Sequence, residues 1–192
     1  MKESITITIA NNKKDINASN KLRKQIFVTQ QKIPEESEFD GNDFGATIII
    51  AKFENQVIGS MRIRYFGEFV KFERMVVAPN FQSKNIPKQI LEYASTFCAK
   101  KGFKKIMSAC SPRLIPYWKR QGFKVTATQQ SFLLNDKELV PVEKEISCPN
   151  PININTPHQV LCLKEIDLIK ENNLTNKLHV ITTFINKKTN CS

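Results

Sequence analysis

The segment ERMVVAPNFQSKNIPKQI, residues 73–90, holds the side chains best placed to do chemistry. An apolar strand runs there through a short polar loop into the start of a helix. A helix start presents free backbone N–H groups and the positive end of the helix dipole, which together bind phosphate-like anions. The segment therefore predicts a cradle for an anion such as pyrophosphate, although an ordinary strand-to-helix crossover has the same outline.

The residues before this segment predict the elements that hold it in place. Isoleucines at alternate positions predict a strand over residues 4–10, and apolar residues four apart predict a helix over residues 15–30, capped by Asp15 or Asn17. The acidic passage IPEESEFDGNDFG is predicted to be a loop. Three apolar runs with short turns follow at residues 47–53, 56–65 and 69–78, which predicts an antiparallel meander.

The residues after the segment alternate between helices and strands. A helical stripe that begins at Ile86 ends at Gly102, and residues 105–109 form a short predicted strand. A second helix is expected to open at Ser111, with Pro112 in its first position, before an extended stretch over residues 123–127. This order mixes a meander with crossover units, so we expect an α/β (α+β) fold with a mixed sheet covered by helices.

The C-terminal part carries a weaker pattern. Residues 137–142 and 159–163 are candidate strands, separated by the turn-rich stretch ISCPNPININTPH, residues 146–158, which is interpreted as an enlarged connection to the final strand. The tail beyond them contains a possible helix and a possible strand but no motif.

Bulk properties limit the class of protein. A chain of 192 residues suits one domain, and it shows neither a long apolar run nor an apolar signal core, so we expect a cytoplasmic protein with no membrane partner. The five cysteines form no CxxC pair and suggest neither a disulfide framework nor a metal site. The net charge of +11 favours an anionic partner such as a nucleotide cofactor, an acidic carrier protein or nucleic acid, although scattered lysine pairs are also typical of a solvated surface.

Over residues 15–125 the chain resembles the GNAT acetyltransferase superfamily. That family's acyl-CoA motif is a strand followed by Gln or Arg, two variable residues, Gly, one variable residue, and Gly or Ala. Here the strand ends at Val77, and Gln82, Asn85 and Pro87 occupy the motif positions. LRKQIFVTQQ, FDGND, VIGSMRIR and YWKRQGF extend the resemblance in the right order.

The resemblance implies a GNAT-like, mostly antiparallel sheet with splayed central strands and flanking helices. It implies an acyltransferase domain over residues 1–165 and a C-terminal extension of unknown role over residues 166–192. The donor would be acetyl-CoA or another acyl-CoA, with pantetheine against the strand and pyrophosphate on the loop amides. The residues that would bind it are Met75, Val76, Val77, Gln82, Ser83, Lys84, Asn85, Ile86, Pro87 and Lys88.

Two motif positions depart from the family pattern. Asn85 replaces a glycine and tolerates a left-handed backbone conformation. Pro87 replaces a small residue and has no backbone N–H to offer a phosphate, although proline suits the first turn of a helix. Lys84 and Lys88 could offset the lost donor with charge.

Transfer of an acyl group to an amine needs a base for the amine proton and benefits from an acid for the departing thiolate. By resemblance Glu73 is the candidate base; an ion pair with Arg74 or a neighbour is the alternative role. By resemblance, Trp118 stands where the family often has a tyrosine that acts as the acid. Tyr117 is therefore the candidate acid, and packing is its alternative role.

A second resemblance is to the acyl-homoserine-lactone synthases, which share the scaffold and take acyl chains from acyl carrier protein. It rests on Arg23, Phe27, Asp40, Asp43 and Arg62. Plain acetyltransferases also show the acidic pair, and a loop that caps itself would explain it too. The two resemblances together make Phe27, Arg62 and Arg64 the candidate substrate-binding residues.

Three functions follow as hypotheses. The first is an N-acyltransferase that moves an acetyl or other acyl group from acyl-CoA to a small-molecule or protein amine. The second is an N-acyl amino acid or acyl-homoserine-lactone-type synthase that depends on acyl carrier protein. The third is a catalytically inactive GNAT-fold module that binds a protein or nucleic acid; since aromatic stacking motifs are not evident, nucleic acid is the least expected partner.

Overall fold

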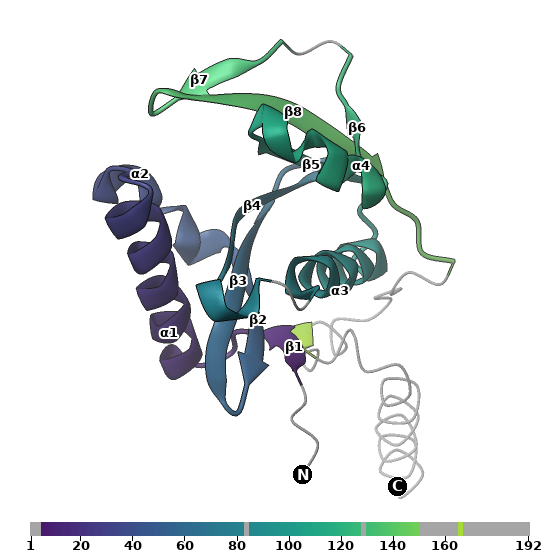
Figure 1. Ribbon diagram of the computed structural model, residues 1–192. Coiled ribbons are helices and arrows are strands. Elements are labelled where there is room, and N and C mark those ends of the chain that lie inside the picture. Colours follow the sequence, from purple (N-terminus) through teal and green to yellow (C-terminus); the bar gives the residue numbers. More distant parts are fainter. Residues whose placement is uncertain (1–4, 83–84, 128–129, 150–164, 167–192) are drawn as a thin grey trace, which may run out of the picture.

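One twisted sheet organises the chain, and helices lie on both of its faces (Figure 1). The computed structural model describes residues 5–82, 85–127, 130–149 and 165–166. The strand order across the sheet is β1-β2-β3-β4-β5-β8-β6, and β7 pairs with β8. β4 and β5 are parallel, while the other pairs are antiparallel. The predicted mixed, mostly antiparallel α/β fold is thereby confirmed.

The first strand and the first helix form where the sequence predicted them. β1 (Thr6–Ile9) leads into α1 (Lys13–Arg23), which continues as a π-helical segment, Lys24–Gln30. The predicted cap was wrong by several residues, because Asn12 accepts a hydrogen bond from the backbone N–H of Asp15 at 2.9 Å. The Asp15 carboxylate instead receives the ammonium of Lys52 at 2.7 Å.

The acidic passage predicted to be a loop contains two short helices. α2 (Glu35–Glu38) is a single turn, and a 3₁₀ helix, Asn42–Gly45, follows it. Neither is long enough to show a hydrophobic period, so the pattern of the sequence could not indicate them.

The predicted meander is present as β2 (Thr47–Phe53), β3 (Gln56–Tyr65) and β4 (Val70–Val77). Glu54 and Asn55 connect the first two strands, and both have positive φ, as a tight two-residue hairpin requires.

β4 and β5 (Lys105–Cys110) pair only at their beginnings, through Val70 opposite Ile106 and Lys71 opposite Met107. The Ser108 hydroxyl then donates to the Phe72 carbonyl at 2.8 Å, and the two strands diverge. The splayed central strands implied by the family resemblance are therefore present. Backbone groups of β4 beyond this point are released from the ladder on that edge.

β4 also carries a bulge beyond the point of divergence. Its register with β3 shifts by one residue between Ser60 and Arg62, and Arg74 has φ 56. A bulge places one extra residue in a strand and turns the backbone that follows. Met75 consequently packs with the core under α3, while Val76 packs under α1.

α3 (Ile86–Lys100) packs on the face of the sheet opposite to α1. The predicted helix after Ser111 begins as a 3₁₀ turn, Pro112–Leu114, and becomes α4 (Ile115–Arg120). Ser111 stands at the N-cap position with Pro112 in the first turn, as predicted, although its side chain makes no capping hydrogen bond to a described residue. None of the described helices is long and apolar enough to cross a membrane.

The C-terminal strands differ most from the prediction. β6 (Lys124–Val125), β7 (Phe132–Leu134) and β8 (Lys137–Glu145) follow α4, and β8 inserts between β5 and β6. The strand predicted at 137–142 is present and longer, whereas β7, which forms a hairpin with it, was not predicted. Residues 150–158 of the predicted connection lie outside the described residues. The candidate strand at 159–163 and residues 167–192 of the extension lie outside the described residues.

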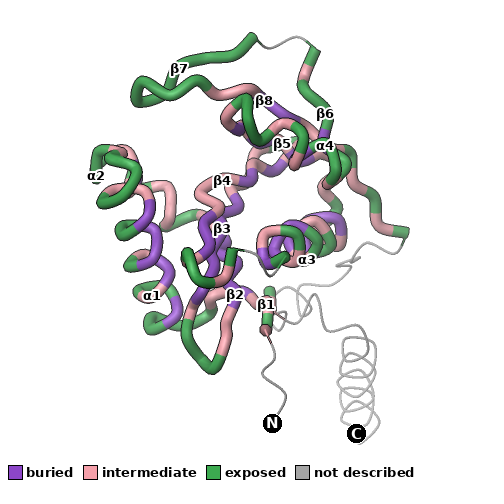
Figure 2. The backbone as a smooth tube through the Cα atoms, in the orientation of Figure 1, coloured by how far each residue is buried: buried purple, intermediate pink, exposed green. Residues whose placement is uncertain are grey.

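Buried positions follow β3, β4 and the sheet-facing side of α3 (Figure 2). Gly59 of β3 lies at their centre, where a Cβ atom would come within 3.1 Å of Ile90 and 3.2 Å of Ile86 and Ala51. The two isoleucines belong to the first turns of α3, so this glycine sets how closely the start of α3 approaches the sheet.

We predict that Gly59→Ala lowers the free energy of unfolding by about 1–2 kcal/mol, because overpacking a dense core forces its neighbours to shift. Urea unfolding of the purified protein measures the change. Gly67→Ala is the matched control, since nothing lies within 4 Å of its Cβ position. Equal stability of the two variants would contradict the packing argument.

Candidate active site

The start of α3 has the features of an anion site. Asn85 precedes the helix with φ 55, in the left-handed conformation that the sequence allowed, and Pro87 lies in the first turn. The first N–H groups of a helix have no intrahelical acceptor, and here Ile86 and Lys88 can supply them while Pro87 cannot. The Asn85 side chain makes no capping hydrogen bond to any described residue. Ser83 and Lys84 lie outside the described residues.

A pocket of about 200 Å³ adjoins this helix start. Two cations, Lys88 and Arg120, lie in its wall, which makes the pocket suitable for an anion. The full wall consists of Gln82, Asn85, Pro87, Lys88, Tyr117, Arg120 and Gln121. The fold therefore joins the loop before α3 to α4, two regions that the sequence could only name separately.

Tyr117 and Trp118 have different environments. Trp118 is buried in the core and packs edge-on against Phe123, with 4.7 Å between ring centroids. Tyr117 lines the pocket, and its buried hydroxyl makes no hydrogen bond to any described residue. Burial raises the pKa of Tyr117, so the hydroxyl remains protonated at neutral pH. The hydroxyl therefore carries a proton that it can donate.

Glu73 lies on β4 among cations, with 9% of its side chain exposed. Arg62 reaches its Oε1 at 2.7 Å, Lys71 its Oε2 at 2.9 Å, and Arg64 lies 3.9 Å away. Burial alone would raise the pKa of Glu73, but the hydrogen bond from Lys71 and the charge of Arg62 outweigh it, so the pKa lies below its ordinary value. The carboxylate is therefore ionised and ion-paired with neighbours other than Arg74.

The two acids of FDGND bind buried arginines rather than only capping their own loop. Arg62 is fully buried and donates to both oxygens of Asp40, at 2.7 and 2.9 Å. These bonds hold the pKa of Asp40 well below its usual range. Asp40 also accepts the backbone N–H of Asn42, so the self-capping interpretation explains only part of its role. Asp43 lies 2.7 Å from Arg23 and 3.3 Å from Arg62.

Glu38 joins α1, α2 and β4 through a second set of ion pairs. It is fully buried, with one oxygen 2.7 Å from Nε of Arg23 and the other 2.8 Å from Nε of Arg74. Burial raises the pKa of Glu38, while the two guanidinium groups favour its carboxylate form. Arg74 also donates to the Ser37 carbonyl at 2.6 Å. The bulge of β4 is thereby fastened to α2.

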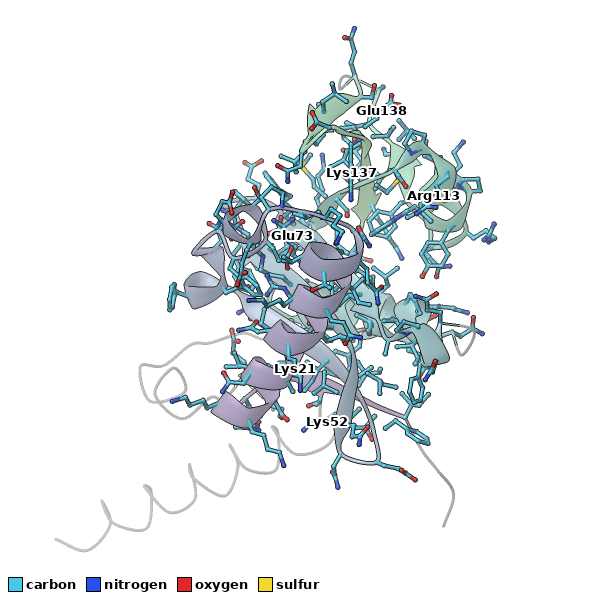
Figure 3. All side chains as sticks on the ribbon, turned by 60° about the vertical axis from the view of Figure 1, so that its left-hand side comes forward. Lys21, Lys52, Glu73, Arg113, Lys137 and Glu138 are labelled. Atoms are coloured by element: carbon cyan, nitrogen blue, oxygen red, sulfur yellow. The ribbon has the colours of Figure 1, made fainter. Side chains whose placement is uncertain are left out.

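The hairpin of β7 and β8 reaches the same region from the other side. The Lys137 ammonium donates to the Gln31 carbonyl at 3.0 Å, and Ser37 donates to Asn135 at 3.4 Å. Glu73 lies between α1 and this hairpin (Figure 3). The sequence indicated neither this hairpin nor the roles of Glu38 and Lys71. The role of Lys71 had one signal, because Lys71 and Glu73 are two residues apart on β4 and so lie on the same face of the strand.

The three substrate-side candidates fall in different surroundings. Phe27 is half-buried and packs with Leu22, Ile26 and Val76 under α1. Arg62 is fully committed to the buried ion pairs, whereas Arg64 is 28% exposed. Only Arg64 of the three is therefore open to a ligand as a charged group.

The comparison with known families agrees with this geometry. The model of the acetyltransferase (GNAT) family matches residues 17–123, which is more than half of the chain. The chain belongs to the GNAT family. The match ends at Phe123, so β6, β7, β8 and the C-terminal residues lie beyond it.

Individual relatives of this GNAT protein are distant. The Bacillus subtilis (strain 168) protein YjcF, described as an uncharacterized N-acetyltransferase, is 22% identical over 122 residues, which cover 64% of this chain and 87% of YjcF. Among solved structures, a putative N-acetyltransferase from Lactobacillus plantarum matches with TM-score 0.69 and 16% identity over 74% of this chain and 99% of its own.

Two further structures bear on ligands. A GNAT family acetyltransferase from Elizabethkingia anophelis, with acetyl-CoA bound, matches with TM-score 0.56 and 18% identity over 76% of this chain and 100% of its own. FeeM, an N-acyl amino acid synthase from uncultured soil microbes, matches with TM-score 0.65 and 9% identity over 74% of this chain and 91% of its own. At these identities the likeness concerns the fold.

We predict that Glu38→Ala lowers the free energy of unfolding by about 3 kcal/mol or more, because removing one partner of a buried ion pair leaves the other charges uncompensated. Thermal or urea unfolding measures the loss. Glu35→Ala on the same helix removes an exposed pair with Lys24, in which both side chains are 53% exposed, and should change stability by less than about 1 kcal/mol. Similar losses in both variants would refute the role of the buried cluster.

Proposed function

We propose that this protein is an N-acyltransferase that moves an acetyl or other short acyl group from an acyl-CoA to an amine. The observation that carries the proposal is the divergence of β4 from β5 after Phe72, beside a helix start and a cationic pocket. The divergence frees a strand edge for the pantetheine arm, and the helix start offers N–H groups to the pyrophosphate. Membership of the acetyltransferase family supports this assignment.

The described residues suit an acyl-CoA, whose thioester supplies the activated acyl group. Met75 and Val77 would lie along the pantetheine arm. Ile86 and Lys88 would offer N–H groups to the pyrophosphate, and the side chains of Lys88 and Arg120 would add positive charge. The acetyl-CoA bound to the Elizabethkingia relative supports the choice of donor.

The transfer step assigns a proton to each of two groups. The amine nitrogen forms a bond to the thioester carbon, and the carbon–sulfur bond breaks. Glu73, an ionised carboxylate, would take the amine proton directly or through a water molecule. Tyr117, which lines the pocket and whose buried hydroxyl is protonated, would give a proton to the departing thiolate. Because cations lower the pKa of Glu73, it acts best once the new bond has made the nitrogen more acidic.

Donor binding is tested first by thermal unfolding with and without acetyl-CoA. The midpoint should rise with ligand concentration, since a ligand that binds only the folded state stabilises it. Pro87→Ala restores one N–H donor in the first turn, so we expect its Kd for acetyl-CoA to fall by about threefold to tenfold. Pro112→Ala, at the start of another helix, serves as the control. No shift of the midpoint at millimolar acetyl-CoA would exclude it as donor.

Acyl transfer is tested with a panel of amines and a thiol-release assay. Glu73→Gln keeps the shape of the side chain but cannot accept a proton, so we expect kcat to fall by about 100-fold, the scale of general base catalysis. Glu68→Gln, in the turn between β3 and β4, should retain activity. Full activity of Glu73→Gln would show that Glu73 serves only as an ion-pair partner.

A second candidate is an N-acyl amino acid synthase that takes its acyl chain from acyl carrier protein. It is favoured by the set of Arg23, Asp40, Asp43 and Arg62, which the fold joins in one buried cluster, and by the likeness to FeeM. A stable complex with acylated carrier protein, without any response to acyl-CoA, would select it over the first. Activity with neither donor would leave a noncatalytic GNAT-fold binding module.

A further inference from the structure

We propose that the amine acceptor carries a carboxylate, as an amino acid does, and that Arg64 and Lys71 bind that carboxylate. The inference rests on the proposed acyl transfer and names the acceptor class for it. It assigns to Lys71 a role in specificity that the sequence did not suggest.

Arg64 and Lys71 are directly opposite each other in the β3–β4 ladder. Two like charges in such a cross-strand pair destabilise a sheet. The next pair on the same face, Arg62 opposite Glu73, combines opposite charges. The face thus presents Arg62, Arg64 and Lys71 around Glu73. Lys71 pairs with Glu73 at 2.9 Å, whereas Arg64 has no carboxylate within hydrogen-bond distance among the described residues.

The neighbouring carboxylates leave Arg64 without a close partner among the described residues, and Lys71 shares its partner Glu73 with Arg62. Glu73 is committed to Arg62 and Lys71, and its 3.9 Å distance to Arg64 is too long for a hydrogen bond. On the next strand Lys71 faces Met107, which is uncharged. The other nearby acids have cationic partners of their own. Asp40 pairs with Arg62, and Asp43 pairs with Arg23 and Arg62. Glu143 pairs with Lys105 and Lys124.

Both cations are accessible and one is held in place. Arg64 is 28% exposed and Lys71 39% exposed, in contrast to the fully buried Arg62. The Arg64 guanidinium lies 5.2 Å from the ring centroid of Phe66, which itself stacks on Phe69. A guanidinium held over an aromatic ring keeps its planar edge for a carboxylate and loses little entropy when it binds one.

The spacing suits an amino acid. Lys71 and Glu73 are two residues apart on β4, about 7 Å along the strand, with side chains on the same face. The proposed base and the proposed carboxylate site are therefore neighbours. A molecule that carries its amine and its carboxylate a few bonds apart reaches Glu73 with the first and Arg64 and Lys71 with the second.

The test measures acetyl transfer from acetyl-CoA to free amino acids and to the corresponding amino acid amides. We expect the wild-type protein to prefer the acid in kcat/KM, and Arg64→Met and Lys71→Met each to reduce the acid-to-amide ratio by about tenfold or more, the value of one charge-assisted bond. Lys21→Met, on the exposed side of α1, should leave the ratio unchanged. Thermal unfolding checks that both variants are folded, since Lys71→Met removes the 2.9 Å ion pair with Glu73 as well as the like-charge pair with Arg64.

The outcomes separate the two proposals. A wild-type protein that acetylates amides as well as acids would overturn the carboxylate-bearing acceptor and leave the acyltransferase function standing. An unchanged acid-to-amide ratio in both variants would do the same. Failure to acetylate either set, or any other amine, would overturn the acyltransferase function and this inference with it.

Discussion

Strand β4 separates from β5 on one side while it stays paired with β3 on the other, and the rest of the site depends on this separation. Its ladder to β5 ends after two residue pairs, at the hydrogen bond from Ser108 to the Phe72 carbonyl. Its ladder to β3 continues with one extra residue at Arg74. Released backbone groups are costly when they are buried without partners, which is why such an opening is suited to a ligand with an extended polar arm.

The buried ion pairs hold this opening from the α1 side. Arg23 and Arg62 connect α1 and β3 to the acids of the α2 region, and Arg74 fastens the bulge itself to Glu38. Buried ion pairs add little net stability compared with apolar packing, but they tolerate few alternative arrangements. Their effect here is to fix the position of β4 relative to α2, and with it the position of Glu73.

The pocket beside α3 and the face of β3 and β4 carry different sets of charged groups. The pocket beside α3 combines N–H groups, Lys88 and Arg120, which suits a phosphate-bearing donor. The face of β3 and β4 combines Glu73 with Arg64 and Lys71, which suits an acceptor that carries both an amine and a carboxylate. The two halves of the site meet along β4, since in the proposed reaction that strand would supply both the edge for the donor and the carboxylate that takes the acceptor's proton.

The sequence by itself determined the order of most elements and the start of α3, because hydrophobic periods, glycines and prolines act locally. The family followed from the resemblance of its motifs to those of GNAT acetyltransferases. The sequence also placed the meander and identified Glu73, Asn85 and Tyr117 as candidates. Only the tertiary structure decided which charges meet, that Glu73 pairs with Arg62 and Lys71, and that β8 inserts beside β5. These facts depend on register between distant strands, and single-turn elements such as α2 (Glu35–Glu38) are too short to show a period.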